Sequence, residues 1–211
     1  MHMEDVLEVY KRPYDRQVPV VCMDEQPTQL IRETRRPVPA KPGQPERVDF
    51  EYERHGTAAN FMFTEPLAGW RKVNVRERRT KADWANEIKQ LLDVDYPDAK
   101  RIVLVCDNLN THKLGSLYEA FPPAEARRLV ERLEIHRTPK HGSWLNIAEI
   151  ELSVFTRQCL DQRIHRLQDL RNHADQWYAD RNRRQKTVAW HFTSHDARIK
   201  LKRLYPQIQM S

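Results

Sequence analysis

The sequence predicts a mixed α/β fold, in which strands come first, a β-α-β unit follows and helices dominate the end of the chain. Short valine-rich or alternating apolar segments fill the first third. The continuous apolar run of Arg101–Asp107 is typical of a central strand that is buried on both faces. From Trp144 onward the pattern is helical, apart from the aromatic stretch Val188–Thr193. This order of elements is typical of a mixed sheet covered by helices.

The elements expected in the first 80 residues are short and separated by turns. Val18–Met23 is a compact apolar run that predicts a buried strand, and we expect this strand to end at Asp24. Closely spaced prolines then predict an extended loop. In chain order the expected elements are a short helix at 3–14, strands at 18–23, 47–54, 58–64 and 71–76, the loop at 34–47 and a turn at His55-Gly56.

The elements expected after residue 80 form a β-α-β unit followed by helices. Lys81–Leu92 carries apolar residues at helical spacing. The buried strand at Arg101–Asp107 leads into helical material that continues to Arg132, and Leu133–Arg137 is a short strand. Such a β-α-β connection places its two strands parallel in one sheet.

Composition excludes several classes of protein. The chain has 211 residues, of which 39% are hydrophobic, so it can bury the core of one domain. Its five glycines lie at least 13 positions apart, so neither a dinucleotide-binding fingerprint nor a P-loop can be written. The apolar runs are too short for a membrane span, and three cysteines without a C-x-x-C pair give no disulfide framework. We therefore expect a soluble, cytoplasmic protein.

The positive charge is unevenly distributed. Residues 157–211 hold 12 Lys or Arg and 5 Asp or Glu, whereas residues 1–156 hold 24 and 25. A second basic run lies at Arg71–Lys81. Such clusters indicate a polyanionic partner, because each neutralised phosphate releases counterions. Basic residues that merely solvate helix faces would give the same counts.

Two aspartates stand at the ends of predicted strands. Asp24 closes the first strand, and Asp107 closes the most buried one. If these strands are neighbours, both carboxylates emerge at the same edge, which is where open α/β sheets place their sites. Each aspartate also has an ordinary explanation, since Asp24 could cap a turn and Asp107-Asn108 is a common turn pair.

A third acid lies on a predicted helix. Ser143 is its expected N-cap, and Glu149 follows beside Asn146 on the flank of an apolar stripe formed by Leu145, Ala148, Leu152 and Phe155. Glu151 points about 200° away, since each residue turns roughly 100°. Glu149 is therefore the better candidate for a site at the sheet edge, although a surface role explains it equally simply.

A set of three oxygen-donor residues that includes no cysteine and no clustered histidine favours Mg²⁺ or Mn²⁺ over zinc. Sites of this kind that hold two ions perform in-line phosphoryl displacement. The residues by themselves thus support the hypothesis of a metal-dependent nuclease that uses Asp24, Asp107 and Glu149.

Three sequence blocks resemble the catalytic blocks of DDE transposases, and are most similar to bacterial insertion-sequence transposases allied to the mariner superfamily. The blocks are 21–25 (VCMDE), 104–112 (LVCDNLNTH) and 138–149 (TPKHGSWLNIAE). Four further stretches are also similar to that group: 65–70 (EPLAGW), 77–80 (ERRT), 120–127 (AFPPAEAR) and 196–206 (DARIKLKRLYP). The resemblance covers nearly the whole chain.

The resemblance implies a ribonuclease-H-like fold, with a five-stranded mixed sheet of three antiparallel and then two parallel strands, flanked by helices. It implies that Asp24, Asp107 and Glu149 are catalytic and hold two Mg²⁺ or Mn²⁺ ions. It also implies a DNA transposase that cleaves transposon ends and transfers a 3′-hydroxyl to target DNA. The resemblance further implies that its partner is double-stranded DNA, that its active complex is a dimer, and that it acts at the bacterial nucleoid in the cytoplasm.

Three features depart from the family pattern. The third block reads Asn146-Ile147-Ala148-Glu149, whereas the wider superfamily has proline after the asparagine. Forty-one residues separate Asp107 from Glu149, a longer spacing than is usual. The N-terminal helix-turn-helix region that reads transposon ends is missing, which indicates an excised catalytic domain or a natural truncation.

We expect a linker with a short helix at 1–17, a catalytic core at 18–161 and a basic helical extension at 162–211. The candidate supporting residues are Asn108, His112, His141 and Asn146, although His112 could equally be a surface residue at a helix start. The candidate DNA contacts are Arg76, Arg78, Arg79, Lys140, Arg181, Arg183, Arg184 and Lys186. Two alternatives stay open: a ribonuclease-H-like nuclease acting on hybrid or branched substrates, and a non-catalytic DNA-binding remnant of a transposase.

Overall fold

A five-stranded sheet organises the chain, in a computed structural model that describes residues 2–35, 38–45, 47, 50–140 and 142–205. The strand order is β3-β2-β1-β4-β5. The first three strands pair antiparallel, and β1-β4 and β4-β5 pair parallel, which confirms the predicted sheet. The strands are β1 (Val20–Glu33), β2 (Tyr52–Glu65), β3 (Trp70–Arg76), β4 (Ile102–Cys106) and β5 (Leu133–Arg137).

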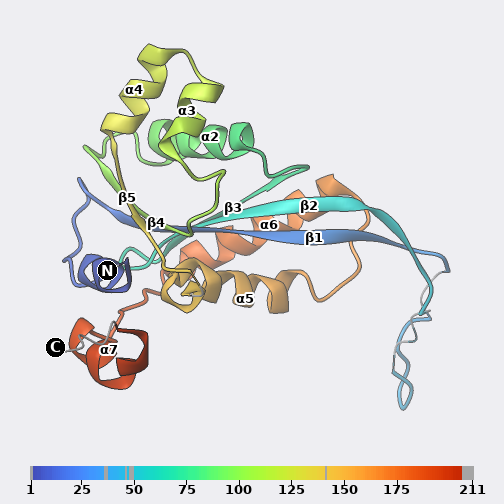
Figure 1. Cartoon of the computed structure of the whole chain (residues 1–211). Helices are drawn as coiled ribbons and strands as arrows, with labels where there is room; N and C mark the ends of the chain where they lie inside the picture. The colour runs from blue at the N-terminus through green and yellow to red at the C-terminus, as the bar shows by residue number, and fades with distance from the viewer. Residues whose placement is uncertain (1, 36–37, 46, 48–49, 141, 206–211) are drawn as a thin grey trace.

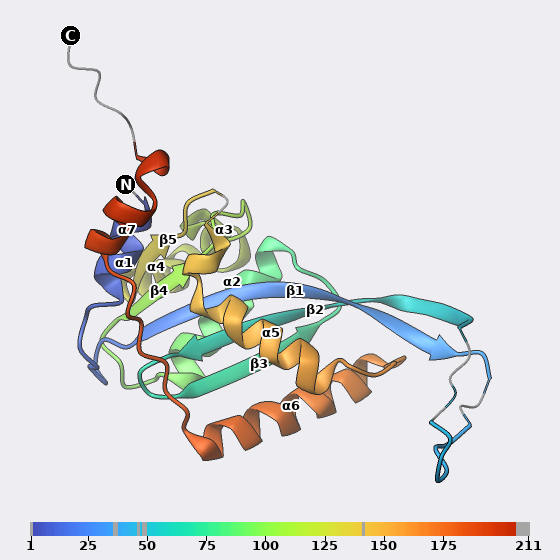
Figure 2. The ribbon, with the colours of Figure 1, turned by 90° about the horizontal axis from the view of Figure 1, so that it is seen from below.

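Helices cover both faces of this sheet (Figure 1). On one face lie α2, α3 and α4, and on the other α5 and α6 cross the strands side by side (Figure 2). The helices are α1 (His2–Val9), α2 (Lys81–Gln90), α3 (Leu114–Ala120), α4 (Pro123–Glu131), α5 (Ile147–Cys159), α6 (Leu167–Arg184) and α7 (Ser194–Lys200), with short turns η1 (Leu91–Asp95), η2 (Ser143–Leu145) and η3 (Lys202–Leu204). Among the described residues no helix is both long and apolar enough to cross a membrane.

Strand alternation divides the core into two layers. In β1, Cys22 belongs to the cluster that contains Phe155 of α5, whereas Val21 and Met23 belong to the cluster that contains Trp84 of α2. All five residues of β4 are buried, because this central strand is covered from both sides. The continuous apolar run in the sequence reflects this two-sided cover.

The strands β1 and β2 extend beyond the sheet as a two-stranded arm (Figure 1). The predictions for this region were partly wrong. Strand β1 does not end at Asp24 but continues to Glu33, and His55-Gly56 is no turn but part of β2. There Leu30 stands opposite two residues, and Gly56 takes a positive φ of 93°, as at a β-bulge. The two strands of this polar arm are paired through their backbones, and backbone pairing produces no pattern of apolar residues in the sequence.

The predicted half-buried strand at 47–54 is also wrong in its placement. Strand β2 begins only at Tyr52, which is 46% exposed, and Phe50 is 86% exposed. Residues 48 and 49 lie outside the described part of the chain. Alternation predicts a buried face only where another layer packs on it, and no helix of the described part of the chain lies over this end of the arm in Figure 1.

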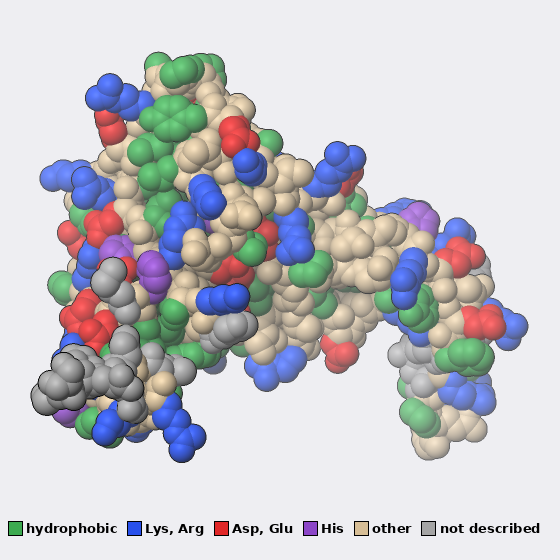
Figure 3. All heavy atoms as spheres, in the orientation of Figure 1, with side chains coloured by type: hydrophobic (Ala, Val, Ile, Leu, Met, Phe, Trp, Pro, Cys, Tyr) green, Lys and Arg blue, Asp and Glu red, His purple; other side chains and the backbone are tan. Residues whose placement is uncertain are grey.

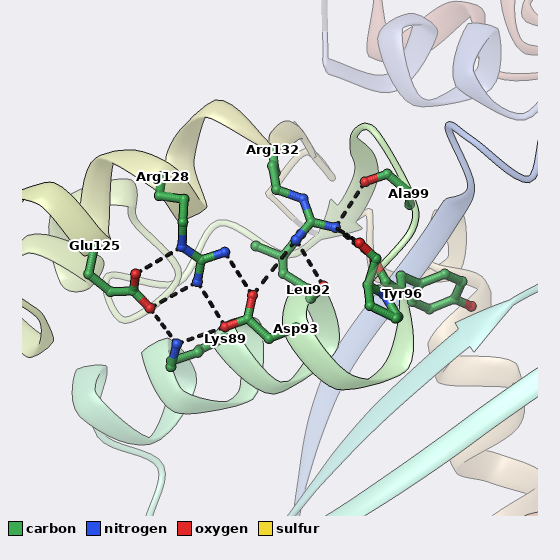
Figure 4. A network of polar contacts seen from close by, with 9 residues as sticks. Lys89, Leu92, Asp93, Tyr96, Ala99, Glu125, Arg128 and Arg132 are labelled. Atoms are coloured by element: carbon green, nitrogen blue, oxygen red, sulfur yellow. Dashed lines mark hydrogen bonds and ion pairs between the residues drawn. The ribbon is translucent and has the colours of Figure 1, made fainter.

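A network of ion pairs fastens α4 to the end of α2 (Figure 4). The Arg128 guanidinium donates to Asp93 and to Glu125, and Lys89 contacts the same two carboxylates. Arg132 forms a longer ion pair with Asp93, at 3.7 Å, and also donates to backbone carbonyls, of which the bond to Tyr96 is 2.7 Å long. The hydrogen bonds from Arg128 and Lys89 hold the pKa of Glu125 well below its ordinary value. Arg132 also donates to the carbonyl of Ala99 at 2.9 Å, which connects this network to the segment just before the start of β4.

The two ends of the described chain pack against each other. Arg198 of α7 donates to Glu4 of α1 at 2.6 Å, and Ser194 donates to Glu8 at 2.5 Å. Just after α1, the Tyr10 hydroxyl donates to the carbonyl of Leu145 at 2.6 Å. The segment before the sheet is thereby connected to the start of α5.

Candidate active site

The parallel pairing of β1 with β4 brings the two aspartates to one end of the sheet. Strand β4 pairs with β1 only over Val20–Cys22, and the two strands then separate. Asp24 lies two residues beyond this pairing, where β1 remains paired with β2. Asp107 directly follows the last residue of β4. Asp24 therefore marks the point where two central strands part, rather than the end of a strand.

Asn146 connects the first aspartate to the helix of the third acid. Its side chain is fully buried, and its Oδ1 accepts a hydrogen bond from the Ala148 amide at 3.1 Å. Its Nδ2 donates to the carbonyl of Met23 at 2.9 Å and to Asp24 Oδ2 at 3.2 Å. One amide side chain thus fixes both the first turn of α5 and the Asp24 carboxylate.

Asn146 rather than Ser143 is the N-cap of α5, so the predicted cap was wrong. Ser143 begins the short turn η2, and its side chain is exposed. Serine and asparagine are both good N-cap residues. Asn146 takes this position here because its side chain also donates to Met23 and Asp24 of β1. Glu149 consequently lies in the first turn of α5, half-buried, and its carboxylate has no hydrogen-bond partner among the described residues.

Two of the three acids act electrostatically on Asp24. Burial, together with the negative charges of Asp107 and Glu149, raises the pKa of Asp24 to about 7, against the opposing hydrogen bond from the Glu25 amide and the charge of His112. Carboxylates that destabilise one another in this way favour a bound cation. The oxygen-only donor set fits Mg²⁺ or Mn²⁺. Within the described ranges, no group of three or more His, Cys, Asp or Glu side chains is arranged so that it could hold a metal ion.

His112 is buried beside Asp107 and is not a surface residue. Its Nδ1 lies 2.5 Å from Asp107 Oδ1, and its Nε2 lies 2.7 Å from Glu25 Oε1. Although burial opposes the charged ring, these two carboxylates raise the pKa of His112 to about 9. Glu25 was not among the predicted site residues. The sequence gives one indication of it: Glu25 follows Asp24 in a strand, so its side chain faces the opposite side of the sheet.

The other candidate supporting residues are less informative. Asn108 is exposed and has no hydrogen-bond partner among the described residues, and Lys140 is also exposed. His141 lies outside the described residues.

Two predicted DNA contacts are paired inside the protein. Arg181 binds both oxygens of Glu151, at 3.0 and 2.9 Å, and Arg76 binds the buried Glu87. Both guanidinium groups thus bind buried carboxylates from other elements, and their contacts with DNA stay a prediction. The sequence could not show this, since the partners lie 30 and 11 positions away.

The remaining basic candidates lie at the surface. Arg183 and Arg184 pair with Asp180 of the same helix, at 3.1 and 2.6 Å. The side chains that are exposed without an ion pair to any described residue are Arg78, Arg79, Lys140 and Lys186. On the face shown in Figure 3 the basic side chains are dispersed from the α3–α4 end to the arm. Such a distribution suits an extended polyanion better than a small anion.

The raised pKa of Asp24 predicts how the stability of the metal-free protein depends on pH. The folded state binds the Asp24 proton more tightly than the unfolded state, so stability falls as the pH rises from 3.8 to about 7. Relative to Asp24→Asn, the chelator-treated wild type should be as stable at pH 4 and less stable at pH 8. Thermal unfolding of both proteins in EDTA at pH 4 and pH 8 measures this. If the stability difference between wild type and Asp24→Asn is the same at both pH values, the pKa of Asp24 is not raised.

Together, the mixed sheet and the acids at its edge define a ribonuclease-H-like enzyme of the kind that cleaves nucleic-acid strands. The model of the DDE superfamily endonuclease family matches residues 19–171, and the chain belongs to this family. No curated protein matches it significantly.

Solved structures of the Mos1 mariner transposase share the fold. Its catalytic domain superposes with a TM-score of 0.57 at 12% identity, covering 88% of this chain and 83% of that one. The Mos1 paired-end complex with Mn gives 0.57 at 18% identity, covering 88% and 56%. The Mos1 strand transfer complex gives 0.58 at 16% identity, covering 84% and 52%. The chain thus spans about half the length of the Mos1 chains in these complexes.

Proposed function

We propose that this chain is the catalytic domain of a transposase, which cleaves DNA strands at transposon ends and transfers them to target DNA. One observation carries the proposal: Asp24, Asp107 and Glu149 lie close enough for the charges of the other two to raise the pKa of Asp24. Membership of the DDE endonuclease family supports strand cleavage. The likeness to Mos1 paired-end and strand transfer complexes supports the finer assignment to transposition.

We assign Asp24, Asp107 and Glu149 as the ligands of two Mg²⁺ or Mn²⁺ ions. Such ions, when bound, activate the attacking oxygen and stabilise the leaving oxygen of a phosphodiester. Asn146 orients Asp24 relative to the first turn of α5. Mos1 complexes with Mn and with Mg support the choice of metals.

The proposed partner is double-stranded DNA, bound mainly through its phosphates by Arg78, Arg79, Lys140, Arg183, Arg184 and Lys186. Binding of this kind depends steeply on salt and only weakly on sequence. A Mos1 paired-end complex with a left transposon end supports DNA as the partner. A dimeric active complex and a cytoplasmic location in bacteria belong to the same proposal.

Incubation with supercoiled plasmid tests the proposal. With Mn²⁺ the wild type should nick and linearise the plasmid, and EDTA should stop the reaction. Asp107→Asn should be inactive, whereas Asp98→Asn, at an exposed position after η1, should cut like the wild type. Absence of cutting by the wild type, or full cutting by Asp107→Asn, overturns the catalytic assignment.

Substrate comparison separates transposition from other nuclease activities. Because binding through phosphates depends only weakly on sequence, a transposase domain should cleave duplex DNA, with or without a transposon end, in preference to branched DNA and RNA–DNA hybrids. Preferential cleavage of the hybrid would instead assign the chain as a ribonuclease-H-like nuclease. Metal-dependent joining of a pre-cleaved 3′-hydroxyl end to plasmid would demonstrate strand transfer directly.

A further inference from the structure

His112 lies between two carboxylates beneath the proposed site. It bridges Asp107 on one side and Glu25 on the other, at 2.5 and 2.7 Å. The side chains of His112 and Glu25 are 0% and 2% exposed, whereas that of Asp107 is 30% exposed. A continuous chain of contacts therefore runs from a buried glutamate through the imidazole to the solvent-facing aspartate.

The imidazole is held firmly in this position. Trp84 of α2 stacks on the ring, with 5.8 Å between centroids and 28° between planes. Arg137 of β5 donates to the carbonyl oxygen of His112 at 2.5 Å and to that of Asp107 at 3.3 Å. Both the ring and the backbone on either side of the turn are thereby fixed, so the histidine provides a rigid support for Asp107.

Glu25 contacts both aspartates by different routes. Its backbone amide donates to Asp24 Oδ1 at 2.7 Å, and its side chain reaches Asp107 through His112. Because neighbouring residues of a strand face opposite sides of the sheet, Asp24 lies on the α5 side and Glu25 on the α2 side. Glu25 alone thus reaches both acids: Asp24 through its backbone amide and Asp107 through His112.

The bridge leaves one oxygen of Asp107 available. Oδ1 is occupied by His112, whereas Oδ2 has no hydrogen-bond partner among the described residues. Outer partners that restrain a ligand carboxylate in this manner select its orientation toward a cation.

We propose that Glu25, acting through His112, is a positioning residue that holds Asp107 in the orientation required for the metal site. This proposal rests on the proposed function, because it concerns the same three acids. It assigns a role to the buried Glu25 that a purely structural ion pair would not have: the strength of its hydrogen bond sets the affinity of the site for divalent cations.

The chain contains a matched control for this arrangement. His136 of β5 also lies between two carboxylates, with Asp5 Oδ2 at 2.8 Å and Glu134 Oε1 at 2.9 Å. None of these three residues contacts the proposed site acids. His136→Phe therefore removes a similar bridge without touching Asp107.

The test measures Mn²⁺ binding to the full chain without DNA by isothermal titration calorimetry, and in parallel the plasmid nicking rate. His112→Phe retains the stacking on Trp84 but breaks the bridge, and should weaken Mn²⁺ binding by about 10- to 100-fold, as loss of an outer partner does. On charge alone, removing a cationic ring would tighten Mn²⁺ binding, so the sign of the change separates the two explanations.

Glu25→Ala and Glu25→Gln remove the same charge, but only glutamine retains an acceptor for Nε2. Alanine should weaken Mn²⁺ binding and slow nicking, and glutamine should recover most of both losses. His136→Phe should bind Mn²⁺ and nick like the wild type. Thermal unfolding shows whether each variant is folded. If His112→Phe is not folded, the comparison of Glu25→Ala with Glu25→Gln serves as the test.

The possible results separate this inference from the proposed function. Equal Mn²⁺ affinity in wild type, His112→Phe and Glu25→Ala, with loss only in Asp107→Asn, overturns the positioning role and leaves the proposed function intact. Equal losses in Glu25→Ala and Glu25→Gln overturn the hydrogen-bond explanation. A wild type that neither binds Mn²⁺ nor cuts DNA overturns both proposals.

Discussion

Replacing Glu149 by glutamine should reduce Mn²⁺-dependent nicking of plasmid DNA by more than about 100-fold, because loss of even an outer partner of a metal ligand costs roughly 10- to 100-fold. The same change should leave stability nearly unaltered. The Glu149 carboxylate is half-buried and bonded to no described residue, so the amide breaks no contact in the protein. Initial nicking rates and urea unfolding of the two proteins measure both effects.

Glu119→Gln is a suitable control for this experiment. Glu119 is an exposed acid of α3, and its ion pair with Lys81 lies at the surface. Its replacement should alter neither nicking nor stability. If Glu149→Gln nicks at the wild-type rate, the third acid of the site has been wrongly assigned.

Replacing Glu151 by alanine should mainly affect stability, in contrast to the Glu149 variant. It should destabilise the fold by about 3–5 kcal/mol, the usual cost of removing one partner of a buried ion pair. The Glu151 side chain is 2% exposed, and it binds Arg71, which is 1% exposed, at 2.9 Å. It also binds Arg181 of α6. Without it, two guanidinium groups, one of them fully buried, lose their counterion.

Urea denaturation measures this loss, and Glu119→Ala provides the comparison. That variant breaks the exposed pair with Lys81, which is worth about 0–1 kcal/mol. A loss below about 1 kcal/mol in Glu151→Ala would show that water enters and solvates Arg71. The two glutamates lie within one helix turn but are expected to differ in role: Glu149 is needed for DNA cleavage, whereas Glu151 is needed for the stability of the fold.

The sequence predicted those features that are expressed locally. The buried run of β4, the helical spacing of α2 and the apolar stripe of α5 appear in the structure as expected, because each side chain there is buried by its own element's face. The positions of Asp24 and Asp107 followed from the same logic, since polar residues that interrupt apolar strands mark an edge of the sheet. The geometric separation of Glu149 from Glu151 followed from helix periodicity alone.

Only the tertiary structure decided the features that depend on distant partners. The arm of β1 and β2 is held by backbone pairing, so its polar residues carried no signal and β1 seemed to end at Asp24. Arg181 carries the charge expected of a DNA contact, but a glutamate 30 positions earlier binds it.

Two contacts between segments complete the site, and neither could be foreseen from a single segment. Asn146 caps α5 because it also reaches Asp24, more than 100 positions away. Glu25 acquires a role only because β4 and its following turn bring His112 beneath Asp107. The periodicity of apolar residues indicates which face of a helix or strand is buried. It does not indicate which side chains of other elements contact that face. The sequence therefore predicted the sheet, which the structure confirms, and the three candidate acids, and the packing of β1, β4 and α5 decided which side chains contact Asp24 and Asp107.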